Sequence, residues 1–468
     1  MTDNVRRNGS SNTGVTLAGV GFRSPIGLAP IGGGSHWGKP DADPDREREI
    51  CLDLMLRNVE AGSSCLYLNF SYLTEETFRK LSGGAPPRTE PDRARPPGER
   101  FMKAATPAAP YGLEGLYSAV SPGPSAPDPQ REPARLLWQA GLVAALKERR
   151  PEGVPIIAGL IGCGGLPDAY VDAARKCEEL GVDLLEINFH CPLQAGQRDG
   201  AENALEQRFP PVSRGGLLIE SPDAMQAIVK GVADAVSIPV GAKFSAEVGF
   251  PRIVRLARLI KDAGAQYISV GGAAVSIAPP DIYNGGRPLW PFVDGNPFCL
   301  TSGSWMRRVC YRDVAAVAEF VPGLDIMASG GLVTPEHCIE AMMLGATVTQ
   351  LCTGVMEQGR GFLRRSNAFL RDFLAGQGYG GAQELVGLSR PYFKYADDLD
   401  VMGGRVFSTV DETKCTHCMR CLDNLCVAIF SEQGRITVDR DRCTGCGACT
   451  IVCQDGAFRL DKETGDHL

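Results

Sequence analysis

Short apolar runs recur along the chain between about residue 18 and residue 376, and a turn and an amphipathic helical pattern follow most of them. An apolar run bounded by Gly or Pro predicts a buried strand, whereas apolar residues spaced three and four apart predict a helix. The predicted strands are residues 26–31, 65–70, 154–160, 184–189, 240–244, 267–270, 325–328 and 348–352. The clearest predicted helices are residues 168–180, 224–236, 253–263, 314–320 and 335–344.

This alternation predicts an α/β fold in which eight parallel strands close into a barrel. Near-continuous apolar strands are typical of a closed parallel sheet, because each strand is buried on both faces. The count of eight favours a TIM (β/α)8 barrel over an open doubly wound sheet. In such a barrel the loops that follow the strands carry the chemistry, so functional residues are expected at the strand ends.

Two stretches interrupt the rhythm and are predicted to be long loops. Residues 83–130 are rich in Pro, Gly, Ala and Arg, and residues 273–302 contain aromatic residues such as Tyr283 and Trp290. Because both follow strands, either is a candidate wall of a substrate pocket. A surface insertion or an oligomer contact is the alternative for each, although the aromatic side chains favour the pocket for the second.

The chain changes character along its length. Residues 1–17 open with a polar stretch rich in Gly, Ser and Asn and are predicted to be disordered. Residues 18–385 form the predicted barrel, residues 386–410 a linker, and residues 411–468 a small α+β domain with a dense cysteine pattern.

Charge and hydropathy exclude several classes of protein. The 48 Lys and Arg residues against 55 Asp and Glu residues give a net charge of −7, which argues against a general nucleic-acid binder. We find neither a signal-peptide pattern nor the run of ~18 apolar residues that spans a membrane. We therefore expect a cytoplasmic protein without membrane contact. Its 17 cysteines would then stay reduced and be available as metal ligands or catalytic thiols.

Eight of these cysteines form two runs in the C-terminal domain. The runs are C-x2-C-x2-C-x4-C and C-x2-C-x2-C-x3-C, at Cys415, Cys418, Cys421 and Cys426, and at Cys443, Cys446, Cys449 and Cys453. Three thiolates at x2 spacing wrap one corner of an iron–sulfur cubane, and in two-cluster ferredoxins the fourth ligand comes from the other run. The pattern therefore predicts two 4Fe–4S clusters, with Cys453 completing the first and Cys426 the second.

A pair of structural zinc sites is the alternative for this domain. Zinc motifs usually bring two C-x2-C halves separated by a longer spacer, which does not match three cysteines in seven residues. The first run departs from the usual ferredoxin pattern by its x4 spacing, and Val427 and Gln454 stand where proline often follows. The extra residue could loosen one cluster or shift its potential.

Two glycine-containing loops stand at predicted strand ends in the barrel. Ser329, Gly330 and Gly331 stand at the end of the seventh strand, and Cys352, Thr353 and Gly354 follow at the end of the eighth. In a barrel these two loops commonly bind a phosphate through backbone N–H groups, because glycine permits a close approach.

Asn188, His190 and Cys191 end the fourth strand, and Lys243 ends the fifth. An amide can bind a planar polar ring, and a thiol can exchange a proton with a substrate carbon, although a lone cysteine is often only a core residue. His190 is a candidate pocket donor or a structural residue, since strand neighbours point to opposite sides. Lys243 needs an anionic partner, such as a flavin edge or a carboxylate, unless it snorkels to the surface.

Ordered motifs give the chain a family resemblance. They are SPIGLAP at 24–30, EINFHCP at 186–192, GAK at 241–243, TSG at 301–303, ASGG at 328–331 and QLCTG at 350–354. With the two cysteine runs after them, they resemble the FMN-barrel and iron–sulfur half of dihydropyrimidine dehydrogenases, in the arrangement of the bacterial catalytic subunit. The barrel itself is similar to dihydroorotate dehydrogenases, and the resemblance covers nearly the whole chain beyond residue 17.

The resemblance implies an FMN at the barrel mouth, with its phosphate at Gly330, Gly331, Cys352 and Thr353. It implies that the flavin site also contains Ala29, Pro30, Asn69, Asn188, Lys243, Gly272, Ser302, Gly303 and Ser329. Cys191 matches the catalytic general acid, which protonates a substrate carbon while reduced flavin delivers hydride to the adjacent one. The clusters would bring single electrons to the flavin.

The departures from the family bear on the substrate. Asn69 stands where the family has a flavin-binding lysine, and Gly165 and Gly272 align with substrate-reading asparagines. A site built to hydrogen-bond a pyrimidine loses discrimination without these amides. We therefore expect an oxidoreductase that reduces or oxidises another conjugated or ring C=C bond, in a wider pocket lined by His190, Tyr283 and Trp290.

Two alternatives remain open: a true dihydropyrimidine dehydrogenase catalytic subunit acting on uracil or thymine, and a non-catalytic flavin and iron–sulfur electron-transfer subunit. Cys191 argues against the second, because a relay needs no acid at the substrate face. The GGG at 32–34 lacks the strand, G-x-G-x-x-G and helix of a nicotinamide site. We therefore expect electrons from a partner flavoprotein reductase subunit, a ferredoxin or a flavodoxin, and expect a homo-oligomer.

Overall fold

The computed structural model places eight parallel strands in one sheet, in the order β3-β16-β15-β10-β9-β8-β7-β4. It describes residues 12–30, 44–70, 72, 74–81, 101–105, 116–120, 132–160, 167–189, 221–277, 280–288, 298–394 and 405–462. The eight strands are β3 (Ile26–Leu28), β4 (Leu66–Phe70), β7 (Ile156–Leu160), β8 (Leu184–Asn188), β9 (Val240–Ser245), β10 (Tyr267–Gly272), β15 (Asp325–Ser329) and β16 (Val348–Leu351). Each coincides with a strand that the apolar runs predict.

The two outer strands of this order meet and close the barrel. The backbone N–H of Ser64, just before β4, donates to the Ile26 carbonyl at 3.0 Å. The N–H of Leu28 donates to the Ser63 hydroxyl at 2.9 Å. The predicted TIM-barrel fold is therefore confirmed.

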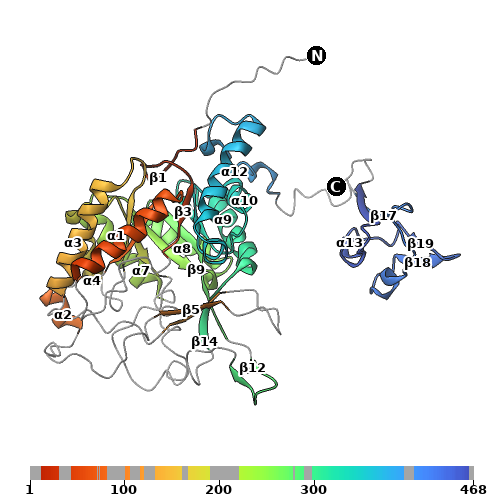
Figure 1. The fold of residues 1–468 in the computed structure, drawn as a ribbon, viewed down its shortest axis with the longest axis horizontal. Helices are drawn as coiled ribbons and strands as arrows, with labels where there is room; N and C mark the ends of the chain where they lie inside the picture. Colours follow the sequence, from red (N-terminus) through yellow and green to blue (C-terminus); the bar gives the residue numbers. More distant parts are fainter. Residues whose placement is uncertain are drawn as a thin grey trace. The chain divides into compact units, whose positions relative to one another are not determined.

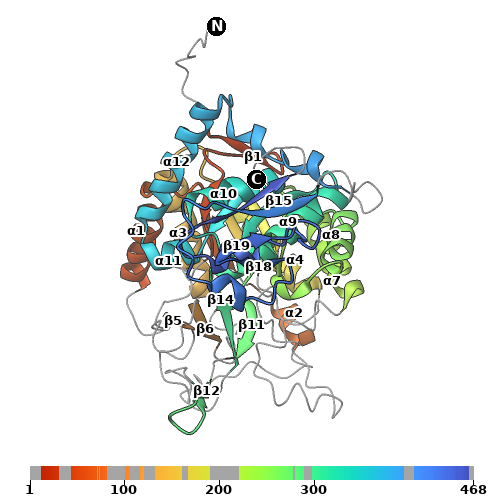
Figure 2. The same cartoon turned by 90° about the vertical axis from the view of Figure 1, so that its right-hand side faces the viewer.

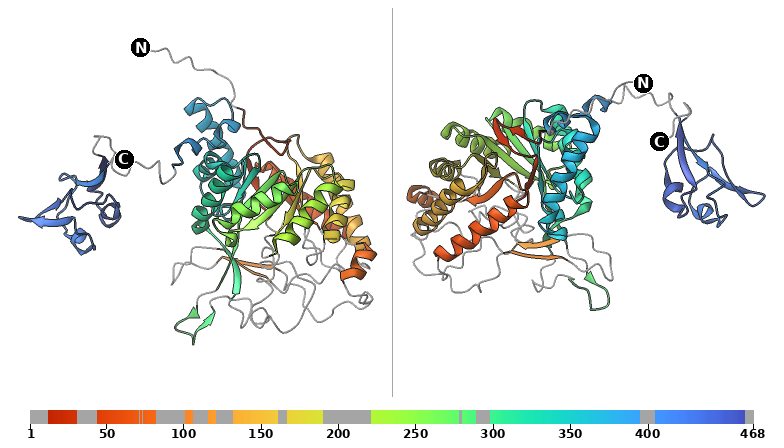
Figure 3. Two further views of the ribbon diagram at one scale, coloured as in Figure 1. Left: turned by 180° about the vertical axis from the view of Figure 1, so that it is seen from behind. Right: turned by 45° about the horizontal axis from the view of Figure 1, so that its top comes forward.

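Helices surround the sheet on its outside (Figures 1 and 3). They are α1 (Pro44–Glu60), α2 (Glu75–Leu81), α3 (Glu132–Arg149), α4 (Pro167–Leu180), α7 (Pro222–Ala235), α8 (Arg252–Asp262), α9 (Arg307–Phe320), α10 (Pro335–Leu344), α11 (Thr353–Gln358) and α12 (Gly361–Gln377). The buried stripe of α8 shows why they pack there, since Ile253, Leu256, Ala257 and Ile260 follow helical spacing. The helix predicted at 314–320 begins earlier, at Arg307.

The barrel interior is filled by side chains that alternate along each strand with those facing the helices. Tyr67 and Tyr267 are the largest side chains of this inner core. Both rings lie over a glycine of a neighbouring strand. A Cβ at Gly159 would come within 2.6 Å of the Tyr67 ring, and a Cβ at Gly241 would collide with Tyr267. Glycine at these two positions therefore makes room for the aromatic layer.

The two predicted loops are not simple loops, because strands within them pair with one another. The strands β5 (Phe101–Ala105), β6 (Leu116–Val120), β11 (Ala274–Ile277) and β14 (Phe298–Ser302) form an antiparallel sheet in the order β11-β14-β6-β5. The prediction missed this sheet because its β6–β14 pairing joins segments about 180 residues apart, as in Leu300 opposite Ser118. Since β11 directly follows β10, the sheet stands at the carboxyl end of the barrel strands (Figure 2).

A short hairpin lies at the opposite end of the barrel. It consists of β1 (Val15–Leu17) and β2 (Val20–Phe22), and the side chains of Val15, Leu17 and Phe22 pack into the inner core. The Ala18 N–H also donates to Asp325 at 2.6 Å. Residues 12–17 are thus ordered, which extends the barrel's side of the chain beyond the boundary predicted at residue 17.

The chain divides into two compact units, residues 1–390 and residues 391–468. In the second, β17 (Val406–Val410) pairs with β20 (Phe458–Lys462), and β18 (Ile429–Glu432) with β19 (Arg435–Val438). The short helices η7 (Arg420–Asp423) and α13 (Ala448–Val452) complete its described part. Across all the described residues, no helix is both long enough and apolar enough to cross a membrane.

Candidate functional site

A buried pair of opposite charges lies inside the barrel. Lys243 on β9 is 4% exposed and Glu186 on β8 is fully buried, with Lys243 Nζ 4.0 Å from Glu186 Oε1. The carboxylate is the anionic partner that a buried lysine requires. A snorkelling lysine is therefore excluded.

Two hydroxyl groups hold the Glu186 carboxylate. Tyr67 donates a short hydrogen bond to Oε1, and Ser269 donates another to Oε2. Lys243 Nζ also lies 5.7 Å from the centroid of the Tyr67 ring, within reach of a cation–π interaction. At 4.0 Å, Lys243 is an electrostatic partner of Glu186 and not a hydrogen-bond donor to it. Its N–H groups therefore remain available to another acceptor.

Polar side chains flank Lys243 on the neighbouring strands. In the parallel register Lys243 stands beside Asn188 on one side and Ser269 on the other. Parallel partners face the same side of a sheet, so all three face the barrel interior. Asn188 is 4% exposed and Ser269 is fully buried. This row lies near the carboxyl ends of β8, β9 and β10.

The glycine loops meet at the same end of the barrel. Gly271, Gly330 and Gly331 have φ values of +87°, +119° and +73°. A Cβ at Gly271 would collide with the Ser329 carbonyl, and one at Gly330 with the Gly271 carbonyl. A Cβ at Gly331 would lie 2.9 Å from the Gly303 carbonyl. The loops after β10, β14 and β15 thus pack backbone against backbone, which only glycine allows.

One unpaired polar atom at this end of the barrel fits an anion. Thr353 Oγ1, on the first residue of α11 directly after β16, is buried without a hydrogen-bond partner among the described residues. Nε of Arg307 is also buried without such a partner, but the guanidinium lies over the Tyr311 ring of the same helix α9, 5.9 Å from its centroid. Buried polar atoms usually have partners, so the unpaired Thr353 hydroxyl is consistent with a phosphate bound here.

The other sequence-predicted flavin residues are distributed around the same mouth. Ala29 and Gly303 are buried, whereas Pro30, Asn69, Ser302 and Cys352 are partly buried. The N–H of Ala29 donates to the Leu351 carbonyl at 3.0 Å, which ties the loop after β3 to the end of β16. Gly272 ends β10 beside Ser245. All of these residues follow, or end, strands at the carboxyl end.

The structure does not place the predicted substrate residues in a pocket wall. His190, Cys191 and Trp290 lie outside the described residues, as does Gly165. Tyr283 is 84% exposed, in the turn that joins β12 (Pro280–Asp281) to β13 (Arg287–Pro288). Its expected place in a pocket wall is therefore not what the structure has. The antiparallel hairpin of β12 and β13 extends away from the barrel (Figure 1), and the residues that join its two strands face solvent.

Sequence reasoning missed the residues that fix Lys243. The sequence shows Glu186 only as part of the EINFHCP motif and assigns no role to Tyr67, Ser269 or Gly271. A carboxylate in an otherwise apolar strand is itself a signal, because it cannot be buried without partners. The partners could not be named, since they come from strands 80 to 120 residues away, as the separations of 119 and 83 residues show.

The cysteines of the second unit gather around its small core. Cys421 and Cys449 are buried there, with Cys415, Cys426 and Cys453 packed against them. Burial raises the pKa of Cys421, and the thiols of Cys415, Cys418 and Cys453 raise it further. Those four cysteines are the set that the spacing predicts for the first cluster. Among the described side chains, no group of three or more His, Cys, Asp or Glu residues is arranged to hold a metal ion.

Backbone N–H groups point at two of the sulfurs. Ser408 N lies 3.3 Å from Cys443 Sγ, and Ala457 N lies 3.3 Å from Cys453 Sγ. Hydrogen bonds to cysteine sulfur are one means by which a protein tunes an iron–sulfur cluster. Soft thiolates together with such donors fit a 4Fe–4S cluster.

The two cysteine runs share a backbone signature. In the second run Gly445 and Gly447, on either side of Cys446, have φ values of +68° and +75°. In the first run the equivalent neighbours of Cys418 are His417 and Met419, at +54° and +61°. Positive φ is uncommon for residues with a side chain, so its repetition at matching positions indicates one loop shape used twice.

Comparison with known families agrees with this geometry. A model described as dihydroorotate dehydrogenase matches residues 139–373, half of the chain. The chain belongs to the dihydroorotate dehydrogenase family. The match contains Glu186, Asn188 and Lys243. It also contains residues 329–331 and 352–353, the two loops that the family resemblance assigns to the flavin phosphate. A second model, a 4Fe-4S binding domain, matches residues 436–459, which contain the second cysteine run.

Curated relatives lie in the same group. The chain is 28% identical over 317 residues to "NAD-dependent dihydropyrimidine dehydrogenase subunit PreA" of Escherichia coli K12, covering 67% of this chain and 65% of the relative. It is 28% identical over 282 residues to "Dihydroorotate dehydrogenase B (NAD(+)), catalytic subunit" of Pyrococcus abyssi, covering 60% of this chain and 79% of the relative. The resemblance inferred from the motifs is thus confirmed. The alignment spans about two thirds of each chain's length in the first case.

Proposed function

We propose that this protein is a flavin- and iron–sulfur-dependent oxidoreductase that reduces or oxidises a C=C bond of a ring or conjugated substrate. The observation that carries the proposal is the buried Glu186–Lys243 pair beside the glycine loops, in a family whose named members are dehydrogenases. An ammonium group that keeps free N–H donors inside a barrel mouth suits the electron-rich edge of a flavin. Active sites of TIM barrels lie at this carboxyl end.

FMN is the proposed flavin, with its phosphate held by Gly330, Gly331, Cys352 and Thr353. When bound, FMN exchanges hydride with a substrate carbon and accepts electrons one at a time. The unpaired Thr353 hydroxyl would donate to the phosphate, and Lys243 would donate to the flavin pyrimidine edge. Tyr67 and Ser269 each donate a hydrogen bond to the Glu186 carboxylate and hold it in place 4.0 Å from Lys243. Asn188 would supply an amide to a polar ring.

Cys191 is the proposed general acid. Reduction of a C=C bond adds hydride to one carbon and a proton to the other, so the site needs a proton donor opposite the hydride source. Cys191 would give its proton to the second carbon and recover one from solvent. In the oxidation direction the same thiolate would remove the proton.

The second unit would carry the electrons. We place two 4Fe–4S clusters there, one on Cys415, Cys418, Cys421 and Cys453, and the other on Cys443, Cys446, Cys449 and Cys426. The loop shape common to both runs and the proximity of Cys421 to Cys453 support two clusters. A flavoprotein reductase subunit, a ferredoxin or a flavodoxin would deliver the electrons. The word "subunit" in the name of the PreA relative favours a protein partner.

Cofactor analysis tests these assignments. The purified holoprotein should contain FMN and about eight iron atoms per chain. Cys421→Ser and Cys449→Ser should each lose about half of the iron, because each removes a ligand of a different cluster. If Cys421→Ser retained all of the iron, the first cluster would be refuted and the second would stand. Cys177→Ser, a buried barrel cysteine, serves as the control and should keep all of its iron.

The substrate is tested by reoxidation of the photoreduced flavin. Under anaerobic conditions, uracil, thymine, orotate and a panel of other cyclic or conjugated alkenes are mixed with the reduced holoprotein. We expect a non-pyrimidine alkene to reoxidise the flavin fastest, and Cys191→Ala to slow the reaction by about 10²–10⁴-fold. Unchanged turnover in Cys191→Ala, with flavin and iron intact, would remove the general-acid assignment.

Dihydropyrimidine reduction is the second candidate. The named activity of the PreA relative favours it, whereas Gly165 and Gly272 in place of substrate-reading amides argue against it. Reoxidation by uracil or thymine with high specificity would establish this candidate. Flavin reduction by a partner protein with no reoxidation by any alkene would instead indicate an electron-transfer subunit.

A further inference from the structure

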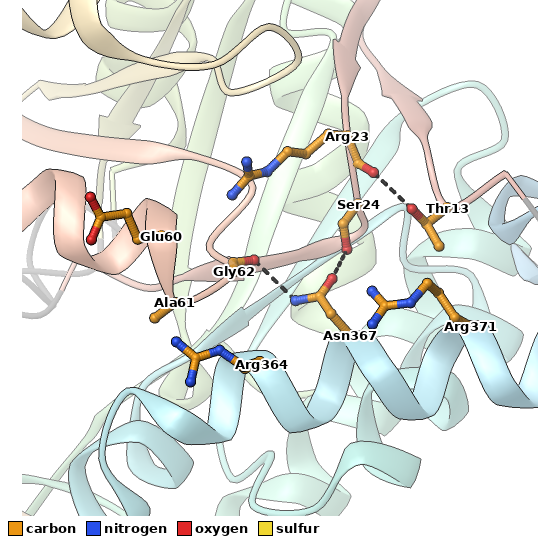
Figure 4. A pocket seen from close by; sticks show the side chains of 9 residues that line it. All are labelled: Thr13, Arg23, Ser24, Glu60, Ala61, Gly62, Arg364, Asn367 and Arg371. Atoms are coloured by element: carbon orange, nitrogen blue, oxygen red, sulfur yellow. Dashed lines mark hydrogen bonds between the residues drawn. The ribbon is translucent and has the colours of Figure 1, made fainter.

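A small hollow lined by arginines lies at the amino-terminal end of the barrel strands, opposite the proposed active site. Its volume is about 210 Å³. Its walls come from the segments before β3 and β4 and from α12, and its lining residues are Thr13, Arg23, Ser24, Glu60, Ala61, Gly62, Arg364, Asn367 and Arg371 (Figure 4). Three arginines face one glutamate, so the lining is net positive.

The floor of the hollow is rigidly built. The Ser24 hydroxyl donates to Asn367 Oδ1 at 2.5 Å. The Asn367 amide donates to the Gly62 and Leu363 carbonyls at 3.0 and 2.8 Å. Ser24 and Asn367 are both buried. These polar groups satisfy one another, so they shape the hollow without competing for a ligand.

The arginines, in contrast, have hydrogen-bond donors to spare. Nη2 of Arg23 donates to the Val59 and Ser63 carbonyls at 2.5 and 2.9 Å, which fixes its guanidinium in the wall. Its Nε and Nη1 make no hydrogen bond to the described residues. Arg364 and Arg371, seven residues apart on one face of α12, make neither ion pairs nor hydrogen bonds within the described part of the chain.

The chemistry of these donors specifies the ligand. A guanidinium group is planar and presents paired N–H donors that match phosphate oxygens. Burial lowers the pKa of Arg23, so its charge is poorly solvated and gains from an adjacent anion. A phosphate group carries a charge of about −1.5 to −2 near pH 7, close to the excess of the three arginines over Glu60. The volume suits a small anion and not an extended chain.

We infer that this hollow is a phosphate-binding site, separate from the flavin phosphate loops, that takes inorganic phosphate or the phosphate of a small monoester. Arg23, which its own hydrogen bonds hold in place, donates to the anion from one side of the hollow. Arg364 and Arg371 donate to it from α12. Glu60 opposes binding and limits the affinity.

Calorimetric titration of the holoprotein, with its flavin site filled, tests the inference. The probes are inorganic phosphate and uridine 5′-monophosphate, in chloride buffer at constant ionic strength. We expect saturable binding of phosphate, weakened about ten-fold in Arg364→Ser and in Arg371→Ser, because each loses a charge-assisted hydrogen bond. Both side chains are exposed, so neither variant should disturb folding.

Two further variants make the outcome decisive. Glu60→Gln should bind phosphate several-fold more tightly, a gain that misfolding cannot produce. Arg255→Ser, an exposed arginine on α8 outside the hollow, carries the same loss of charge and should bind as the wild type does. Equal affinity in wild type, Arg364→Ser and Arg371→Ser, or no binding of either probe, would overturn the site. Binding of phosphate alone would identify the free ion, and binding of both probes a monoester.

Discussion

The barrel mouth and the second compact unit, called the cysteine module below, both hold candidate redox groups. They position these groups in two different ways. In the barrel, the charged groups are held by strand register and burial: Lys243 and Glu186 are at most 4% exposed. In the cysteine module the proposed ligands stand on loops, except Cys421 in η7 and Cys449 in α13, and Cys418 and Cys446 are exposed. Regular strands position the first set, whereas positive backbone φ angles position the second.

Because the two sites are built differently, substitutions in them should have different consequences. Buried charges depend on one another, so removing one partner leaves the other without compensation in a low-dielectric interior. Thiols that bind a cluster depend on the backbone shape between them and on the metal itself, so the proposed ligands should do so too. Substitutions in the barrel mouth should therefore act first on stability, and those in the cysteine loops first on cluster retention.

The largest effect is expected from Glu186→Gln. Glutamine keeps the shape but leaves Lys243 buried without its counter-charge, which should lower the free energy of unfolding of the barrel by about 3–5 kcal/mol. Urea unfolding followed by far-ultraviolet circular dichroism measures the change. Glu179→Gln is the control, because Glu179 is exposed and its surface ion pair with the partly buried Lys176 should contribute less than about 1 kcal/mol.

A double variant tests the same buried charge pair in a second way. The double variant Glu186→Gln, Lys243→Met removes both charges and should recover part of the lost stability, because no unpaired charge remains. A double variant less stable than Glu186→Gln would show that the pair is not electrostatically coupled, against the barrel half of the comparison.

The next effect concerns the loop shape of the cysteine module. Gly445→Ala introduces a Cβ at positive φ that would lie 2.6 Å from the Val406 carbonyl. Gly456→Ala meets nothing within 4 Å, although its φ is also positive. We expect Gly456→Ala to cost about 1 kcal/mol and Gly445→Ala clearly more, seen as earlier loss of cluster absorbance on heating. Equal melting of the two variants would mean that Val406 simply moves away.

The smallest effect is a gain. His417→Gly relieves a side chain held at a φ of +54°, and should stabilise the first cysteine loop by about 1 kcal/mol. His417→Ala is the matched control, because it removes the imidazole but keeps the Cβ and its strain. Retention of cluster absorbance during heating compares the two. If alanine stabilised as much as glycine, the cause would be the imidazole and not the backbone.

Sequence reasoning reached most of the barrel because its signals are local. Each strand is a short apolar run that shows its own burial, and all eight were predicted. The sheet β11-β14-β6-β5 escaped because nothing local in residues 101–120 indicates a partner near residue 300. Tyr283 was misplaced for a related reason: an aromatic residue signals burial only when a surface lies opposite it, and here the turn of a hairpin presents it to solvent.

In the candidate site, too, local features could be predicted and contacts between distant segments could not. Lys243 and the glycine loops could be found from residue type and position, because a buried charge and a close backbone approach each demand a specific residue. That Glu186 is the partner of Lys243, and that Tyr67 and Ser269 hold its two oxygens, could not be found in this way. Nor could the arginine hollow, which joins residue 23 to residues 364 and 371.

The sequence by itself determined the eight-stranded barrel, the two cysteine runs and the family, because periodicity, ligand spacing and motif order are properties of neighbouring residues. Only the tertiary structure decided which charges meet, which loops touch and where an anion fits. Closing the barrel brings distant strands within a few ångströms, and at that range burial and hydrogen bonding fix which side chains become partners.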